Sequence, residues 1–357
     1  MKNYKIAIIG LAHSHAGQLY KYFLPHAENM TVLGFADYGP FDKQTPEERR
    51  TNMWLKEGEP APTEYKDYKE LLALKPDIVV VTAENCRCTE VALEAMEQGA
   101  VVVLEKPMCP TLAEARALKE CAERNNTHVF TNWPICWMPA FTKARELAHS
   151  GKIGKIQRVV YRSPATMGPY GINEPVEHKA RTWWYSKEQG GGSFLDYACY
   201  GTMLATWIFG KPAKRVSAIT KQFNVASFSD VEDYSAMMLD FGDGVGLLEG
   251  SWSSFNPGEI PSGPIIYGEK GVIVAHRYSD LVKVYTTWSH GYTEPDEVYD
   301  TSDIPKTHRF GENVMAFLEG RGELEEMLGV DVNLAVAAAL DAGRRSADEG
   351  TWVETGL

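Results

Sequence analysis

Residues 4–20, YKIAIIGLAHSHAGQLY, join a short apolar run to a glycine and then to a segment with helical spacing. Similar apolar runs follow as TVLGFAD (31–37), DIVVVTA (77–83), VVVLEKP (101–107) and HVFTN (128–132). Short runs that are apolar throughout are typical of strands buried on both faces. Because helical patterns such as EVALEAMEQG (90–99) separate them, the sequence predicts an α/β domain with a doubly wound parallel sheet over residues 1–131. The polar, proline-bearing segment 39–65 interrupts this alternation, and we expect it to be a surface excursion.

The remainder of the chain, residues 132–357, follows a different pattern. Strand-like runs occur at 156–163, 213–223, 233–254, 263–276 and 280–289. Few helical patterns separate these runs, and turn signals at Gly242-Asp243 and at 269–271 indicate hairpins. We therefore expect an α+β domain with a mostly antiparallel sheet. An alanine-rich helix over about 331–348 closes the chain and is expected to pack back on the first domain.

Composition limits the partners and the compartment. The chain has 36 basic and 48 acidic residues, a net charge of −12, and the acidic side chains are scattered. Nucleic acid and anionic membranes are therefore poor partners. The first strand leaves no room for a signal peptide, and no run approaches the ~18 apolar residues of a membrane span. Six cysteines without a CxxC pair indicate neither a disulfide framework nor a zinc site, so we expect a cytoplasmic protein.

The glycine after the first strand is the first candidate for cofactor binding. Gly10 occupies the strand-to-helix turn at which dinucleotide-binding folds hold a pyrophosphate, although Ala12 and His15 replace the second and third glycines of GxGxxG. The second strand ends at Asp37, whose carboxylate would accept ribose hydroxyls and repel a 2′-phosphate, favouring NAD over NADP. The alternative is a plain strand-turn-helix with Ser14 as N-cap.

His13 and His15 also raise the possibility of a metal site. Residues two apart do not share a helix face, and we see no carboxylate or cysteine cluster nearby in the sequence to complete a ligand set. We therefore expect no metal and interpret both histidines as loop residues near a phosphate.

A buried carboxylate and a phenol mark the second candidate site. The stretch GGGSFLDYACYG (190–201) opens an apolar helix in which Asp196 is the only charged residue, and Tyr200 lies four positions further on. Both side chains point from one face, and a buried carboxylate needs a cation or hydrogen bonds. Lys106, at the carboxyl end of a buried strand, is the expected cation, and an ammonium beside a phenol lowers the pKa of that phenol. The alternative is a glycine-rich helix start with Asp196 bonded to backbone amides.

These motifs resemble one known family. KIAIIGLAHSH (5–15), ADYG (36–39), the stretch from 85 to 108 that ends LEKPM, GGGSFLDYACYG and the closing helix resemble the Gfo/Idh/MocA oxidoreductases in order and spacing. The resemblance implies a Rossmann domain, a second domain with an open-faced sheet, and a nicotinamide between them. It also implies that Lys106 and Asp196 lie in the active site.

The resemblance is closest to one branch of that family. Most members carry a histidine where this chain has Tyr200, whereas the glucose-fructose oxidoreductase and dihydrodiol dehydrogenase branch uses a tyrosine. Glu84 replaces the usual proline of a TPN turn, and Cys88 replaces a common histidine. Thr82, Asn85 and Glu105 are expected to line the cofactor site together with Lys106.

Aromatic and basic residues predict the substrate class. Sugar rings pack on indoles and hydrogen-bond to basic side chains, so the candidate contacts are Trp133, His178, Arg181 and Trp183.

The sequence thus predicts an NAD-dependent oxidoreductase that acts on a secondary hydroxyl of a sugar, cyclic polyol or related carbohydrate. Tyr200 would exchange the hydroxyl proton, Lys106 would polarise the oxygen, and Asp196 would orient the substrate or the lysine. Two alternatives stay open: an NAD-dependent glycoside hydrolase or lyase that oxidises the ring transiently, and a non-catalytic nucleotide-binding regulator. An apolar open sheet face predicts a homodimer or homotetramer.

Overall fold

The computed structural model describes residues 2–23, 30–39, 42–55, 62–164, 168–255, 260–288, 290–291, 293–304 and 309–357. The chain forms two compact units, each assembled from three segments. The parallel-sheet unit comprises Met1–Asn132, Pro175–Gly191 and His308–Ala337. The open-sheet unit comprises Trp133–Glu174, Gly192–Thr307 and Ala338–Leu357. The first boundary follows Asn132, one residue beyond the expected 131, but the return of 175–191 to the parallel-sheet unit was not predicted.

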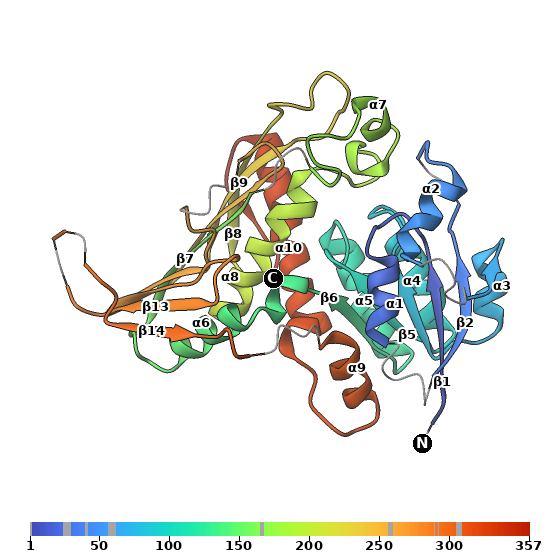
Figure 1. The fold of residues 1–357 in the computed structure, drawn as a ribbon, viewed down its shortest axis with the longest axis horizontal. Helices are drawn as coiled ribbons and strands as arrows, with labels where there is room; N and C mark the ends of the chain where they lie inside the picture. Colours follow the sequence, from blue (N-terminus) through green and yellow to red (C-terminus); the bar gives the residue numbers. More distant parts are fainter. Residues whose placement is uncertain are drawn as a thin grey trace. The chain divides into compact units, whose positions relative to one another are not determined.

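The parallel-sheet unit contains a six-stranded sheet with the order β3-β2-β1-β4-β5-β6 (Figure 1). Its strands are β1 (Tyr4–Ile9), β2 (Met30–Ala36), β3 (Glu64–Tyr65), β4 (Ile78–Val81), β5 (Val101–Glu105) and β6 (Val129–Asn132). All the pairs are parallel, and the order is that of a Rossmann fold. The doubly wound parallel sheet is therefore confirmed.

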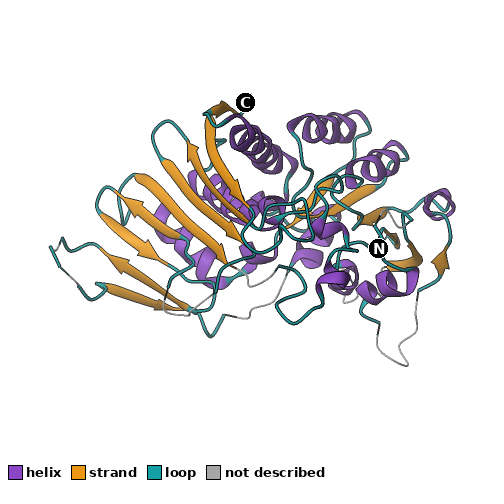
Figure 2. Ribbon diagram, turned by 90° about the horizontal axis from the view of Figure 1, so that it is seen from above, coloured by secondary structure: helices purple, strands orange, loops and turns teal. Residues whose placement is uncertain are grey.

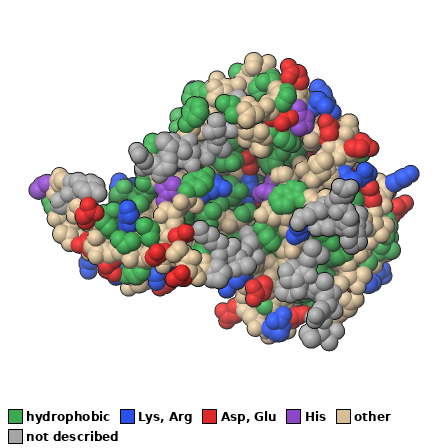
Figure 3. All heavy atoms as spheres, viewed as in Figure 1, with side chains coloured by type: hydrophobic (Ala, Val, Ile, Leu, Met, Phe, Trp, Pro, Cys, Tyr) green, Lys and Arg blue, Asp and Glu red, His purple; other side chains and the backbone are tan. Residues whose placement is uncertain are grey.

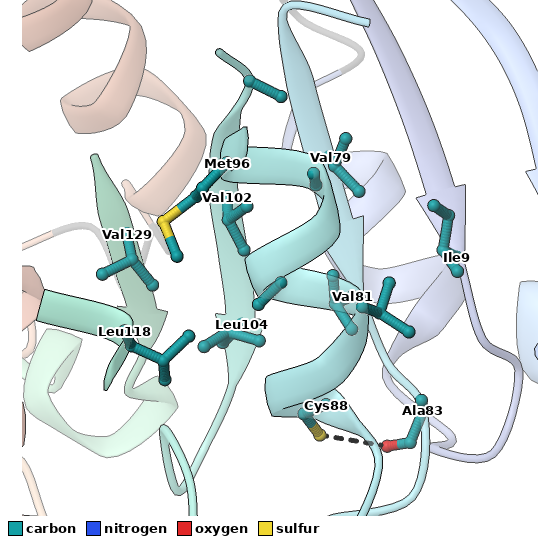
Figure 4. Packing of buried hydrophobic residues seen from close by; sticks show 14 of the residues in the cluster. Ile9, Val79, Val81, Ala83, Cys88, Met96, Val102, Leu104, Leu118 and Val129 are labelled. Carbon is teal, nitrogen blue, oxygen red and sulfur yellow. Dashed lines mark hydrogen bonds between the residues drawn. The ribbon is translucent and has the colours of Figure 1, made fainter. Parts of the chain in front are cut away.

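Helices cover this sheet because its strands are apolar on both faces. The helices of this unit are α1 (Ala16–Phe23), α2 (Pro46–Arg50), η2 (Thr51–Met53), α3 (Tyr68–Ala73), α4 (Cys88–Glu97), α5 (Leu112–Arg124), α7 (Val176–Lys179), η4 (Trp183–Tyr185), α9 (Phe310–Leu318) and η6 (Glu326–Leu328). Figure 4 shows Met96 of α4 beside Val102 of β5, and both side chains are fully buried. The Cys88 thiol donates a hydrogen bond to the Ala83 carbonyl, which ties the start of α4 to the end of β4 (Figure 4).

The open-sheet unit contains a nine-stranded sheet, seen in Figure 2, with the order β14-β13-β12-β11-β7-β10-β9-β8-β15. Its strands are β7 (Ile156–Pro164), β8 (Arg215–Lys221), β9 (Tyr234–Asp240), β10 (Val245–Ser251), β11 (Ile265–Gly268), β12 (Gly271–Val274), β13 (Leu281–Tyr285), β14 (Glu297–Asp300) and β15 (Val353–Glu354). All pairs are antiparallel except β7 with β10. The mostly antiparallel sheet is confirmed.

One face of this sheet carries helices and the other is open. The remaining helices are η3 (Pro134–Trp137), α6 (Pro139–His149), the π-helical turn η5 (Phe194–Ala198), α8 (Cys199–Phe209) and α10 (Val330–Glu349). Gly201 of α8 lies close to Tyr161 and Leu248, which point to the helix-covered face. Residues of β7, β8, β9 and β10 line a hollow, and among them Ile219 and Met238 are 54% and 42% exposed. Alternation along each strand therefore separates the core face from the open face.

Two sequence expectations need correction or refinement. Segment 39–65 is not simply a surface excursion, because Arg49 within it is fully buried; residues 40–41 and 56–61 lie outside the described residues. The closing helix α10 begins in the parallel-sheet unit, where Asp331 accepts a hydrogen bond from Lys119, and it ends in the open-sheet unit.

Acidic and basic side chains are mixed on the surface, as their scatter along the sequence indicates. Lys and Arg are interspersed with Asp and Glu on the face shown in Figure 3. In the part of the chain that the structure describes, none of the helices has the length and apolar character needed to cross a bilayer.

Candidate active site

The turn between β1 and α1 is shaped for close backbone approach. Gly10 adopts φ +85°, and a Cβ there would lie 2.4 Å from the backbone nitrogen of Ala83. A Cβ on Gly17 would lie 2.2 Å from the Met53 carbonyl oxygen, so only glycine lets the first turn of α1 approach η2. Ser14 is exposed in the turn before α1. The tight turn predicted at Gly10 is present. The role of Gly17 was not predicted, because the GxGxxG motif does not include that position.

His13 is buried in this turn and has one unsatisfied polar atom. Its Nδ1 accepts the backbone N–H of His15 at 3.1 Å, so the hydrogen of the neutral ring is on Nε2. Among the described residues, Nε2 has no hydrogen-bond partner. Burial, with smaller contributions from His15 and Lys106, holds the pKa of His13 well below its ordinary value, so the ring is neutral. The site therefore presents a neutral N–H donor that an acceptor atom of a ligand can satisfy.

Glu105 at the end of β5 contacts the same turn. Its carboxylate lies 3.0 Å from His15 Nδ1 and accepts a hydrogen bond from Asn132 at 2.9 Å. Burial raises the pKa of Glu105, but His15, Lys106 and Asn132 outweigh burial and hold it below its ordinary value. Lys106 follows Glu105 and is 3% exposed.

Atoms of His13, His15 and Glu105 that could bind a metal lie within 4.8 Å of one another. No local pattern indicated that a carboxylate would reach the two histidines, because Glu105 is 90 residues beyond His15. In this arrangement, however, His13 uses its only lone pair on the His15 amide. The group is therefore a poor set of metal ligands.

Asp37 lies at the end of β2, as expected, but most of its hydrogen-bonding capacity is already used. Its Oδ1 accepts hydrogen bonds from the backbone N–H groups of Leu11 at 3.0 Å and Tyr38 at 2.9 Å. It also accepts a hydrogen bond from Nη2 of Arg49 at 2.8 Å. Oδ2 accepts Nε of Arg49 at 2.5 Å. The side chain is 21% exposed, and Oδ2, which accepts only one of these hydrogen bonds, has more capacity left for a ligand than Oδ1.

Arg49 is a site residue that the sequence did not reveal. Its fully buried guanidinium also donates to Glu84 at 2.9 Å and lies 3.6 Å from Asp42. Burial raises the pKa of Glu84, although Arg49 opposes this, and Glu84 Oε2 has no hydrogen-bond partner among the described residues. One guanidinium thus neutralises part of a cluster of three carboxylates, which leaves the cluster net negative.

Segment 175–191 packs on the glycine turn within the parallel-sheet unit. The Trp183 indole donates to the Ala12 carbonyl at 2.8 Å, and its ring stacks on Trp184 with centroids 3.9 Å apart. Asn85 donates to the Gly190 carbonyl at 2.9 Å. Thr82 is nearby in the fold, where its hydroxyl donates to the Gly10 carbonyl at 2.6 Å.

Two of the predicted substrate contacts are therefore engaged inside this unit. Trp183 is 1% exposed, and Arg181 binds Glu48 at 2.9 Å and the Lys43 carbonyl. His178 is partly exposed on α7. Aromatic clustering indicated a ligand site, but it could not reveal that Trp183 covers the glycine turn.

The three glycines before Asp196 each meet a close neighbour. A Cβ would lie 2.7 Å from Asn85 Cβ at Gly190, 2.2 Å from the Trp184 carbonyl oxygen at Gly191, and 2.2 Å from Glu232 Oε1 at Gly192. Gly190 and Gly192 also have φ +79° and φ +103°. The run of glycines is thus explained by close approach and by backbone conformation.

Asp196 and Tyr200 lie on the helical stretch that follows. The sequence predicted one regular helix, but residues 194–198 form a π-helical turn, a feature common at functional sites. Both side chains are 6% exposed, and the Trp252 indole donates to Asp196 at 3.0 Å. The Tyr200 ring meets Trp133 edge-on with centroids 6.2 Å apart. Asp196, Tyr200 and Trp133 belong to the open-sheet unit, whereas Lys106 belongs to the parallel-sheet unit.

Comparison with known families agrees with this fold. Residues 4–133 match the oxidoreductase family with an NAD-binding Rossmann fold, and residues 141–274 match the Gfo/Idh/MocA C-terminal domain. The chain belongs to the Gfo/Idh/MocA oxidoreductase family.

Individual relatives are distant. A trans-1,2-dihydrobenzene-1,2-diol dehydrogenase of Xenopus laevis is 26% identical over 216 residues, which cover 59% of this chain and 59% of the relative. GenD2 from gentamicin A biosynthesis, solved in complex with NAD, has TM-score 0.73 and 22% identity, covering 100% of this chain and 97% of that one. The WlbA dehydrogenase of Bordetella pertussis, solved with NADH and UDP-GlcNAcA, has TM-score 0.75 and 18% identity and covers both chains completely. The solved structures support the fold, and the substrate of this chain is a separate question.

Proposed function

We propose that this protein is an NAD-dependent oxidoreductase that acts on a secondary hydroxyl of a carbohydrate or polyol. The observation that carries the proposal is the pairing of buried Asp196 and Tyr200 on one helical stretch, in a chain that also has Lys106 at the end of β5. The diol acted on by the Xenopus relative and the UDP-sugar acid bound by WlbA are consistent with a polyhydroxylated substrate.

The parallel-sheet unit fits a dinucleotide. Gly10 leaves space that a side chain would fill, and the unsatisfied His13 Nε2 offers a donor to an acceptor atom of the cofactor. Asp37 would accept a ribose hydroxyl through Oδ2. When bound, NAD supplies the hydride acceptor.

The proposed chemistry assigns each remaining role to a residue of the chain. The Tyr200 phenolate takes the proton of the substrate hydroxyl, and the Lys106 ammonium polarises the oxygen and favours the ionised phenol. Asp196, held by Trp252, orients the substrate or Lys106. Buried surroundings strengthen these electrostatic interactions.

The test is Tyr200→Phe, which keeps the ring and removes the titrating oxygen. We expect turnover to fall by ~10²–10⁴-fold, with nearly constant NADH affinity.

Activity left in Lys106→Met should have a more alkaline pH optimum, because the phenol loses the charge that favours ionisation. A panel of sugars, polyols and glycosides is assayed by NADH formation, and glycoside cleavage without NADH accumulation would instead indicate the lyase.

The matched control is Tyr197→Phe, which removes a phenol whose ring lies 6.0 Å from that of Tyr200. It should keep turnover within about twofold, as expected for a phenol outside the proton transfer. Near wild-type turnover of Tyr200→Phe on a confirmed substrate would make Tyr200 a packing residue.

We also propose that the open face of the nine-stranded sheet joins copies of the chain into a dimer or tetramer. Exposed Ile219 and Met238 lie on this face beside the hollow lined by β7 to β10. An apolar sheet face of this kind favours self-association. Light scattering at micromolar concentration tests the proposal, and a monomer would contradict it.

A further inference from the structure

Arg277 lies beside the proposed catalytic tyrosine in the open-sheet unit. It follows β12, and its backbone N–H donates to the Ser262 hydroxyl at 3.1 Å. Its guanidinium carbon is 5.9 Å from the ring centroid of Tyr200 and 5.9 Å from that of Tyr278. The side chain is only partly exposed. A cation therefore stands next to the phenol that the proposed function places at the reacting hydroxyl.

The guanidinium of Arg277 is not satisfied by the residues around it. Within the described ranges, which leave out residues 256–259, it makes neither an ion pair nor a hydrogen bond. Burial has the largest effect on its charged form, and the largest electrostatic effects come from the phenols of Tyr161, Tyr197, Tyr200 and Tyr278. A partly buried guanidinium without an anion loses hydration that no hydrogen bond to the described residues replaces. Binding an anion would restore charge-assisted hydrogen bonds.

From this geometry we propose that the substrate carries a carboxylate and that Arg277 binds it, so that the enzyme acts on a sugar acid or a related polyhydroxy acid. The inference rests on the proposed function, because that function places the reacting hydroxyl at Tyr200. A planar guanidinium matches a carboxylate through two parallel hydrogen bonds. The carboxylate and the reacting hydroxyl would then belong to one small molecule.

A carboxylate fits this site better than a phosphate does. The proposed function assigns the Lys106 ammonium to the reacting oxygen, which leaves Arg277 for the acid group, and after burial the largest effects on the charge of Arg277 come from phenols. Asp196 adds a carboxylate four residues from Tyr200, on the same helical stretch. A monoanion is balanced by one guanidinium, whereas a phosphate with nearly two charges calls for more.

The test compares ligands that differ only in the acid group. D-glucuronate is paired with D-glucose, and D-galacturonate with D-galactose, and binding to the protein saturated with NADH is measured by calorimetry so that no turnover intervenes. We expect at least one uronate to bind about tenfold or more tightly than its neutral partner, as one charge-assisted bidentate contact provides. Equal binding within both pairs, or no detectable uronate binding, would overturn the inference.

Variants assign the preference to Arg277. Arg277→Met should abolish the preference for the acid and leave the affinity for the neutral sugar unchanged. Arg277→Lys should restore part of the preference, because lysine has the positive charge but not the two parallel donors of a guanidinium. Both should fold, since no hydrogen bond of the guanidinium to described residues is lost, and circular dichroism checks this. A preference that survives in Arg277→Met would contradict the assignment.

Arg158→Met is the matched control. It removes another guanidinium that lies over a tyrosine ring, 3.9 Å from the Tyr267 centroid, and it should leave the acid preference unchanged. The failure of the inference and that of the proposed function give different results. Oxidation of neutral sugars without uronate binding contradicts only the inference, whereas Arg277-dependent uronate binding without NADH formation from any of these sugars contradicts only the proposed function.

Discussion

Two buried or partly buried arginines, one in each unit, have opposite surroundings. Arg49 in the parallel-sheet unit is fully buried and binds Asp37 and Glu84, with Asp42 3.6 Å away. Arg277 in the open-sheet unit is partly exposed and faces phenols. The first has a surplus of anions, and the second has none among the described residues.

The difference shows how to separate a structural cation from a ligand-binding one. A guanidinium whose donors are taken by carboxylates of its own unit cannot bind a ligand without breaking those pairs. A guanidinium that remains reachable and unsatisfied can gain from a ligand what the fold does not supply. Arg49 therefore serves the fold and holds Asp37 in place, while Arg277 serves recognition.

The largest expected effect is on stability. Arg49→Met leaves buried carboxylates without their counter-charge and should lower the free energy of unfolding by about 3–5 kcal/mol. Arg277→Met loses only contacts with aromatic rings and should change it by no more than about 1 kcal/mol. Urea unfolding followed by tryptophan fluorescence measures both.

The neighbouring Arg50 provides the control for Arg49. It binds Glu64 at 2.8 Å, but both side chains are more than 40% exposed. Arg50→Met should therefore cost at most about 1 kcal/mol. If Arg49→Met costs no more than Arg50→Met, the buried cluster does not depend on its guanidinium and the contrast with Arg277 fails.

The second prediction concerns cofactor choice. Because Arg49 is engaged by carboxylates, it cannot receive a 2′-phosphate, and Asp37 repels one. NADH should bind about 100-fold more tightly than NADPH, a difference of about 2.7 kcal/mol. Asp37→Asn should narrow that ratio about tenfold, because it removes one of the repelling charges.

Fluorescence titration with both nucleotides checks this prediction. Glu64→Gln, which removes a carboxylate on the surface next to Arg50, should leave the ratio unchanged. Comparable affinities for NADH and NADPH in the wild-type protein would show that Arg49 breaks its ion pairs with the carboxylates and binds the 2′-phosphate. Arg49 would then bind a ligand as Arg277 does, and the contrast between the two arginines would fail.

Local patterns predicted most of the fold. Apolar runs located β1, β2, β4, β5 and β6, and turn signals located the β9–β10 and β11–β12 hairpins, because both depend on neighbouring residues. The sequence did not predict β3, because this strand has only two residues. It also did not predict the burial of Arg49, because polar composition indicates exposure. The carboxylate of Glu84 that compensates the charge of Arg49 comes from 35 residues away.

The site was predictable in part for the same reason. The spacing of Asp196 and Tyr200 placed them on one helical stretch, and the GxGxxG-like turn located Gly10. Arg277 has no local signal, since a single arginine after a strand is ordinarily solvated, and only the sheet brings it to Tyr200. Trp183, unlike Arg277, belongs to an aromatic cluster that can be seen in the sequence. The contact of Trp183 with the Ala12 carbonyl could not be predicted, because it depends on the return of 175–191 to the parallel-sheet unit.

The smallest predicted effect extends the contrast to His13, whose Nε2–H is unsatisfied in the parallel-sheet unit. Its pKa in the folded protein lies well below the ordinary value of 6.5. As the pH falls below that value, the unfolded chain takes up a proton that folded His13 resists. The stability provided by neutral His13 is therefore fully present above about pH 6.5 and is lost at up to about 1.4 kcal/mol per pH unit below it.

Urea unfolding of the wild type and of His13→Gln between about pH 7.5 and about pH 5.5 isolates this contribution, since the variant lacks the titrating ring. The wild type should lose more stability on acidification than the variant does. His128→Gln is the comparator, because partial burial also lowers the pKa of His128 but leaves that ring in contact with solvent, so its removal should alter the pH dependence less. If wild type and His13→Gln lose stability in parallel, His13 accepts a proton in the folded state. Because Nε2 already carries a hydrogen, that proton would go to Nδ1 and would break its hydrogen bond with the His15 amide.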